Sequence, residues 1–170
     1  MELHDGPIVL RRWREDDEPH VYAACQDRAI QRWLPDIPRP YSHADAHAFV
    51  TDALGLGPYQ FAITEHGDVV GSVGLRLGKH QIGHIGYWCA PQARGRGIMT
   101  RALRQVCRYA LDELCIERLD LETDIENFAS QRVAEKVGFR PEGTLRSHVR
   151  HPDGHRRDSK LFSLLPGELR

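Results

Sequence analysis

The stretch PQARGRGIMT, residues 91–100, places two arginines between glycines directly ahead of a segment with helical periodicity. A helix N-terminus presents unpaired backbone N–H groups and roughly half a positive charge. Gly95 and Gly97 have no Cβ, so the backbone there can approach a ligand closely. Such a loop can enclose a phosphate, with Arg94 and Arg96 as cationic donors at its rim. On these grounds alone, an ordinary strand–helix turn with two solvated arginines explains the stretch equally well.

Strand and helix patterns alternate around this loop. A glycine-rich strand pattern over residues 80–90 precedes it, and residues 98–114 carry an apolar stripe at helical spacing. A strand of alternating polarity is predicted at 118–124. A second helix is predicted over 127–139, where Gly138 stands at the position of a left-handed C-cap.

The outer segments complete a mixed order of elements. They are predicted as a strand at 7–13, a short helix from His20, a proline-rich loop at 33–42, a helix capped by Ser42, strands at 59–65 and 69–78, and two closing strands joined by a Pro-Asp-Gly turn within 144–165. We therefore expect a mixed α/β (α+β) fold whose mostly antiparallel central sheet has about seven strands and is flanked by about four helices. No linker or repeat divides the chain, so residues 1–170 are predicted to form one domain.

Composition excludes several classes of function. The chain has 170 residues, 41% apolar and 28% charged, with a formal net charge of −1, so no global basic field recruits nucleic acid. The N-terminus lacks a signal-peptide pattern, and no apolar run approaches the roughly 20 residues that span a bilayer. The four cysteines show no CxxC spacing and are typical of free thiols in a reducing cytoplasm. His148, His151 and His155 lack the spacing of metal ligands, so no metal is expected.

The sequence lacks two common nucleotide-binding motifs but matches a third phosphate-binding pattern. No GxxxxGK[ST] string occurs, and GRGIMT places Thr100 where the GxGxxG fingerprint needs glycine. Residues 92–97, QARGRG, resemble instead the Q/R-x-x-G-x-G/A signature with which GNAT N-acyltransferases bind the pyrophosphate of acyl-coenzyme A. The longer segments IGYWCAPQARGRGIMTRAL and ENFASQRVAEKVGFRPEGTLR resemble the RimJ/RimL branch, the ribosomal-protein N-terminal acetyltransferase type. The opening IVLRRWREDD and the closing DSKLFSLL fit the same branch, so the resemblance covers nearly the whole chain.

The resemblance implies a binding cleft between two splayed strands, one on each side of the long helix in the sequence. Pantetheine would enter the gap, and backbone N–H groups at the start of the long helix would hold the pyrophosphate. An N–H near Trp88 to Ala90 would polarise the thioester carbonyl. The residues that the resemblance places around acetyl-CoA are Trp88, Cys89, Ala90, Gln92, Arg94, Gly95, Arg96, Gly97, Ile98, Met99, Thr100, Asn127 and Ser130.

The implied catalytic groups depart from the wider superfamily. Many members carry a tyrosine four residues before the Gly-Phe pair as a proton donor to sulfur, and here that position is Ala134. The resemblance to this branch implies Ser130 as the alternative, and its hydroxyl would lie one helical turn beyond Asn127, within reach of the sulfur. Both residues also have simpler explanations, Asn127 as a helix cap and Ser130 as a solvated helix residue. His84 is a candidate base because its pKa suits proton transfer near neutral pH, although a surface histidine is an equally simple interpretation.

The acceptor side is less well defined. Trp33 and Tyr41 lie in the proline-rich region that lines the acceptor cleft in relatives, and Glu122 and His148 lie on strands expected to face it. Trp33 could equally pack the loop against the core. Val149 stands where ribosomal members can place a carboxylate, which weakens any transfer of ribosomal specificity.

Three functions remain open at this stage. The resemblance favours a bacterial, cytoplasmic N-acyltransferase that moves an acetyl group from acetyl-CoA to a primary amine by direct attack in a ternary complex. The acceptor would be a protein α-amine or a small-molecule amine, and the branch admits a homodimer. A non-catalytic acyl-CoA sensor of the same fold is the second possibility. A nucleotide or nucleic-acid binder that uses the arginine-rich face 94–108 is the third.

Overall fold

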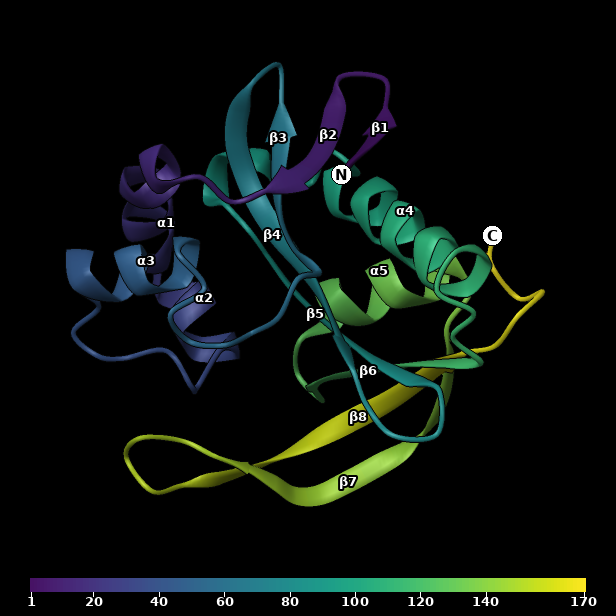
Figure 1. Ribbon diagram of the computed structural model, residues 1–170. Coiled ribbons are helices and arrows are strands. Elements are labelled where there is room, and N and C mark those ends of the chain that lie inside the picture. The colour runs from purple at the N-terminus through teal and green to yellow at the C-terminus, as the bar shows by residue number, and fades with distance from the viewer.

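A single eight-stranded sheet organises the computed structural model, which describes residues 1–170 (Figure 1). The strands are β1 (Glu2–Asp5), β2 (Ile8–Arg12), β3 (Gln60–Glu65), β4 (Asp68–Leu77), β5 (Ile82–Cys89), β6 (Arg118–Asp124), β7 (Arg140–Arg150) and β8 (Arg156–Leu164). The α-helices are α1 (Glu18–Cys25), α2 (Arg28–Trp33), α3 (His43–Val50), α4 (Ile98–Asp112) and α5 (Phe128–Val137). The mixed α/β class is confirmed.

The counts of seven strands and four helices are each one too low. The additional strand, β1, forms a short hairpin with β2 through a turn at Gly6, which has φ of 58°. The additional helix, α2, has six residues, with Asp27 accepting a hydrogen bond from the Ile30 N–H at 3.0 Å as its cap. Elements this short carry too few residues for a periodic pattern to reveal them.

The sheet order is β1-β2-β3-β4-β5-β6-β8-β7, and only the β5–β6 pair is parallel. These two strands pair from Ile82 with Arg118 to Ile85 with Leu121 and then separate. Residues 86–89 of β5 therefore have no partner on that side, whereas residues 122–124 of β6 continue to pair with β8. This divergence is the splayed strand pair that the resemblance implied.

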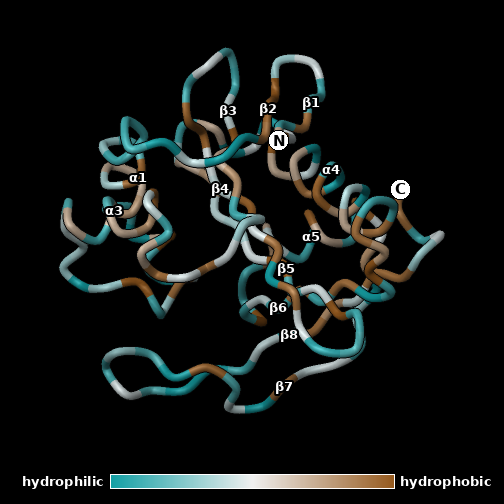
Figure 2. Tube along the Cα trace, viewed as in Figure 1, coloured by the Kyte–Doolittle hydropathy of each residue, from teal (hydrophilic) through white to brown (hydrophobic).

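Two hydrophobic clusters fix the layers. The larger one packs α4 and α5 against the sheet, and the smaller one joins α1 and α3 to Trp88 and Ala90 beside the loop. Figure 1 shows the three N-terminal helices on one side of the strands and α4 and α5 on the other, and Figure 2 shows hydrophobic stretches along the central strands and α4. No helix in the structure is long and apolar enough to cross a membrane.

The long helix α4 follows its sequence pattern closely. Ala102, Leu103, Val106 and Ala110 are fully buried, so the apolar stripe faces the sheet as predicted. Burial of a leucine or valine side chain contributes about 1.5–3 kcal/mol. This packing fixes the helix axis, and with it the position of the helix N-terminus near the end of β5.

Candidate active site

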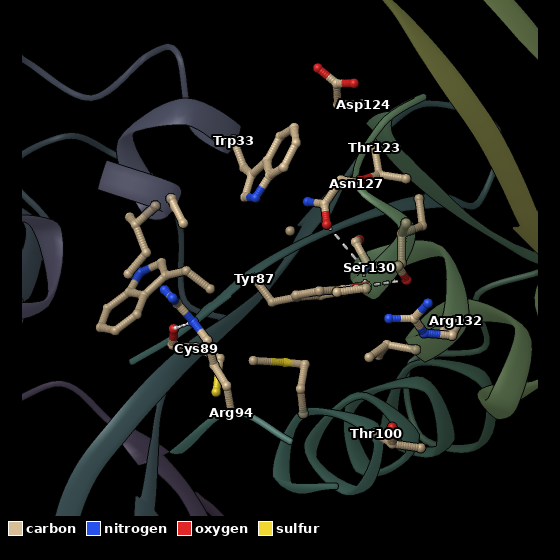
Figure 3. A pocket seen from close by; sticks show the side chains of 18 of the residues that line it. Trp33, Tyr87, Cys89, Arg94, Thr100, Thr123, Asp124, Asn127, Ser130 and Arg132 are labelled. Atoms are coloured by element: carbon tan, nitrogen blue, oxygen red, sulfur yellow. Dashed lines mark hydrogen bonds between the residues drawn. The ribbon is translucent and has the colours of Figure 1, made fainter. Parts of the chain in front are cut away.

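A cavity of about 460 Å³ opens where β5 and β6 diverge (Figure 3). Its wall is formed by the free end of β5, the loop and first turn of α4, the end of β6 and one face of α5. The C-terminal end of α2 closes the far side with Trp33 and Leu34. Residues far apart in the sequence therefore meet at one concave site, which is the usual form of a small-molecule site.

The start of α4 presents a row of unpaired backbone donors. The N–H groups of residues 95–100 donate to no protein acceptor, and the helix has no side-chain cap. Gly95 and Gly97 have φ of 75° and 76°, a conformation that L-residues rarely adopt. No heavy atom lies within 4 Å of a Cβ built at either glycine, so the space beside the backbone is open. The loop is thus shaped as an anion site.

The arginine side chains of the loop do not serve as free cations. Arg94 lines the cavity, but its Nη2 lies 2.6 Å from Asp27 Oδ1 and its Nε donates to the Cys89 carbonyl. Arg96 lies 2.7 Å from Glu65 and is not among the lining residues. The expectation that both side chains form the rim of a phosphate site is therefore wrong for Arg96 and only partly met by Arg94. The backbone, not the guanidinium groups, supplies the donors.

The pair between Arg94 and Asp27 links the loop to α2. Burial alone would raise the pKa of Asp27, but the Arg94 guanidinium and the Ile30 N–H outweigh it and lower the pKa. Farther along the same helix face, Arg101 pairs with Asp5 at 2.7 Å. Three of the five arginines in residues 94–108 are thus paired with acids, which weakens the interpretation of this face as a nucleic-acid site.

Asn127 caps α5 and also lines the cavity. Its Oδ1 accepts the Ser130 N–H at 3.1 Å and caps α5, as the simpler interpretation held. Its amide nitrogen makes no hydrogen bond within the protein, and the side chain lines the cavity (Figure 3). The cap therefore orients the amide so that a donor remains available to a ligand.

A hydroxyl pair lies in the wall of the cavity. The Tyr87 hydroxyl, on β5, lies 2.9 Å from Ser130 Oγ and 3.2 Å from the Ser130 carbonyl oxygen on α5. Burial raises the pKa of Tyr87 far above its ordinary value. Sequence reasoning missed Tyr87. The only signal was its position next to Trp88 on a strand already assigned to the cleft.

Two predicted residues lie away from the cavity. His84 belongs to the part of β5 that still pairs with β6, opposite Asp120, and its ring lies beside Gly78. It does not line the cavity, so its expected place beside the cleft is wrong. Tyr41 is buried in the cluster of α1 and α3 and does not line the cavity either. Its apolar ring was needed for packing between these helices.

Some of the loop and strand residues of the predicted site line the cavity, and others do not. Trp88 and Cys89 line the cavity, as do Gly95, Gly97 and the first turn of α4. Ala90 is buried in the cluster of the N-terminal helices, and Gln92 is exposed in a short turn of 3₁₀-helix. Neither faces the cavity, because the chain bends away from it between β5 and the glycines.

A second cavity of about 250 Å³ adjoins the first and shares Trp33, Glu122 and Thr123 with it. Glu122 contacts no lysine or arginine, and its Oε2 lies 3.6 Å from His148 Nδ1. His148 also approaches Ser159 Oγ at 3.2 Å but lines neither cavity. Of the four predicted acceptor-side residues, Trp33 and Glu122 therefore line the cavity wall and His148 lies behind Glu122. Tyr41 lies elsewhere.

A buried ion pair at the junction of the cavities was not predicted. Arg157 Nη1 lies 2.8 Å from Asp124 Oδ2, and Arg157 Nη2 donates to the Trp33 carbonyl at 3.2 Å. The contact holds the end of α2 against the sheet across the cavity. Its partners are 33 residues apart in the sequence, and no local pattern reveals such a pair.

Free helix N–H groups, an unpaired strand edge and a hydroxyl pair meet in one cavity, an arrangement suited to a phosphate-bearing ligand. Residues 8–140 match the family model described as the acetyltransferase (GNAT) domain. The chain belongs to this family.

The chain is similar to proteins of the RimJ/RimL type and to other acetyltransferases. YdaF of Bacillus subtilis, provisionally named a ribosomal N-acetyltransferase, is 37% identical over 49% of this chain and 45% of its own length. The chain spans about half the length of the first curated relatives that it matches, 45% and 54%. A GNAT-family acetyltransferase from Bacillus anthracis has a TM-score of 0.88 at 21% identity and covers 97% of this chain and 98% of its own. RimL, the ribosomal L7/L12 α-N-protein acetyltransferase, solved with coenzyme A, has a TM-score of 0.86 at 20% identity over 97% and 98% of the two chains.

Proposed function

We propose that this protein transfers an acetyl group from acetyl-CoA to a primary amine, by direct attack in a ternary complex. The observation that carries the proposal is the row of free N–H groups over residues 95–100, which opens into the cavity between β5 and β6. A thiol-release assay with acetyl-CoA and a panel of amines tests it. Release of free thiol that depends on the amine is the expected result, and binding without any release would favour the sensor alternative.

The residues present fit acetyl-CoA along the length of the cavity. The N–H groups at the start of α4 would hold the diphosphate, and the unpaired edge of β5 over residues 86–89 offers backbone groups to pantetheine. The free amide of Asn127 suits a pantetheine carbonyl. Arg132 and Lys136 line the same cavity from α5 and have no acidic partner, so they would attract further phosphate groups.

Direct attack is favoured over an acyl-enzyme because the cysteine in the cavity is not activated. Burial raises the pKa of the Cys89 thiol, and the nearby Arg94 and Arg96 do not offset this effect. A nucleophilic cysteine needs a lowered pKa, since the thiolate is the reactive form. Acetyl-CoA itself supplies the activated acyl group, so the chain has to position the amine and remove its proton.

Ser130 is proposed to stabilise the departing sulfur. A thiol has an ordinary pKa of about 8.5, whereas an alcohol is a much weaker acid, so Ser130 would not give up its proton to a thiolate. It would instead donate a hydrogen bond as charge develops on sulfur. Glu122, at the junction of the two cavities, is proposed to take the proton of the amine, and Trp33 to line the acceptor path.

The Ser130→Ala variant is expected to lower kcat about 10- to 100-fold, because a hydrogen bond to a charged group contributes about 1.5–3 kcal/mol. The Kd for acetyl-CoA should change less than about twofold, since the bond forms mainly in the transition state. Thiol release and calorimetry measure the two quantities. The Ser130→Thr variant keeps a hydroxyl and should retain more activity. An unchanged kcat in Ser130→Ala would remove Ser130 from the mechanism.

The acceptor itself can be a protein α-amine or a small molecule. The second cavity offers Trp33, Ile37 and Val149 as apolar contacts and Glu122 as an acid, a combination that suits either kind of amine. Assays with matched peptide and small-molecule amines would distinguish them. The homodimer stays a prediction, which sedimentation of the intact chain tests.

A further inference from the structure

We propose that Tyr87 is a positioning residue that holds the Ser130 hydroxyl with its hydrogen directed at the sulfur of coenzyme A. This inference rests on the proposed function, since it assigns the sulfur to the part of the cavity that Ser130 lines. Tyr87 comes from β5 and Ser130 from α5, so the contact bridges the two walls of the cavity (Figure 3).

The geometry leaves two arrangements of the hydrogen atoms. The distance of 2.9 Å between Tyr87 Oη and Ser130 Oγ allows either atom to be the donor. If Ser130 donates to Tyr87, its hydrogen is used and only lone pairs face the cavity. If Tyr87 donates to Ser130, the serine hydrogen is free, because Ser130 Oγ has no other partner in the structure. Only the second arrangement can stabilise a thiolate, so negative charge on sulfur selects it.

The carbonyl oxygen of Ser130 does not compete strongly for the phenol proton. It lies 3.2 Å from Tyr87 Oη, farther than Ser130 Oγ. It also lies within α5, four residues before Ala134, where a backbone N–H can use it. The phenol is therefore free to donate to the hydroxyl.

Tyr87 acts as a hydrogen-bond donor and not as a proton source. Burial raises the pKa of its hydroxyl well above that of an ordinary tyrosine, whereas a thiol has a pKa of about 8.5. A thiolate is therefore too weak a base to remove the phenol proton. The phenol stays protonated through the working pH range, so it always has a hydrogen to donate to Ser130 Oγ when charge develops on sulfur.

The test measures the thiol of bound coenzyme A and needs no acceptor. Coenzyme A is titrated with base in complex with the wild type, Tyr87→Phe, Ser130→Ala and the double variant, and thiolate formation is followed by ultraviolet absorbance. In the wild type the pKa of the bound thiol should lie below that of free coenzyme A titrated under the same conditions. Tyr87→Phe should raise it by roughly half to one unit, the contribution of one hydrogen bond. Ser130→Ala should raise it at least as far, and the double variant should match Ser130→Ala.

This double-mutant cycle distinguishes a positioning role of Tyr87 from a packing role. The Tyr87→Phe variant keeps the ring, so Kd for coenzyme A should stay within about twofold, and Tyr59→Phe serves as a matched control. Tyr59 packs on the core beside Tyr109 and lines neither cavity. A wild-type thiol pKa in Tyr87→Phe would overturn the inference, as would shifts that add fully in the double variant.

Failure of the proposed function gives a different result. If the thiol pKa follows this pattern but no amine accepts the acetyl group, the positioning role holds and the transfer reaction is contradicted. If transfer proceeds while the thiol pKa is the same in all four proteins, the transfer holds and the role of Tyr87 is refuted. Coenzyme A that fails to bind would contradict both.

Discussion

The Gly97→Asp variant loses more than about 100-fold in affinity for acetyl-CoA while the chain stays folded. Gly97 precedes α4 with φ of 76°, and no protein atom lies within 4 Å of a Cβ placed there. An aspartate would bring a negative charge to the row of free N–H groups and compete with the diphosphate for them. Loss of two charge-assisted hydrogen bonds at about 1.5–3 kcal/mol each accounts for the expected effect.

A variant at a second glycine separates loss of the diphosphate site from the effect of backbone strain. Gly167 has φ of 88° and no heavy atom within 4 Å of a Cβ, but it lies near the C-terminus and lines neither cavity. The Gly167→Asp variant should show a similar cost of about 1 kcal/mol in stability for the unfavourable φ and full affinity for acetyl-CoA. Calorimetry and thermal unfolding measure both properties. Wild-type affinity in Gly97→Asp would contradict the proposed diphosphate site.

The Glu122→Gln variant should lower kcat about 100-fold at neutral pH, within the range of general-base catalysis. Glu122 is the acid that lines both cavities without a lysine or arginine partner, so it can accept a proton from an amine held between them. Glutamine keeps the shape but cannot take the proton. The Kd for acetyl-CoA should stay unchanged.

A second variant identifies the base more specifically. The kcat of His84→Ala should stay within about twofold of the wild type, because His84 lies in the paired part of β5 outside the cavity. A His84→Ala variant that loses as much kcat as Glu122→Gln would overturn this assignment. A Glu122→Gln variant with full kcat at neutral pH would show that the amine loses its proton by another route.

The parts of the fold that follow local patterns were predictable. The stripe of α4 and the cap at Ser42 depend on neighbours within one or two helical turns, and both are confirmed. The glycines of the loop were identified because a residue without a Cβ lets the backbone approach a ligand, and both have positive φ in the structure. The elements β1 and α2 are too short for such patterns to reveal them.

Contacts between distant segments decided the rest of the site. Arg96 faces Glu65 across 31 residues, so its side chain was unavailable for the predicted role. Tyr87 meets Ser130 across 43 residues, and only the divergence of β5 from β6 brings them together. Strand alternation alone could not show where pairing stops along β5, which is why His84 was expected beside the cleft and Tyr87 was missed.

The binding of the diphosphate by the start of α4 is tested most directly by backbone amide NMR of the intact chain during titration with acetyl-CoA. The account predicts saturable shifts that are largest at Gly97, Ile98, Met99 and Thr100, whose N–H groups have no acceptor within the protein. A titration that saturates with these four amides unchanged, or that never saturates, would contradict it.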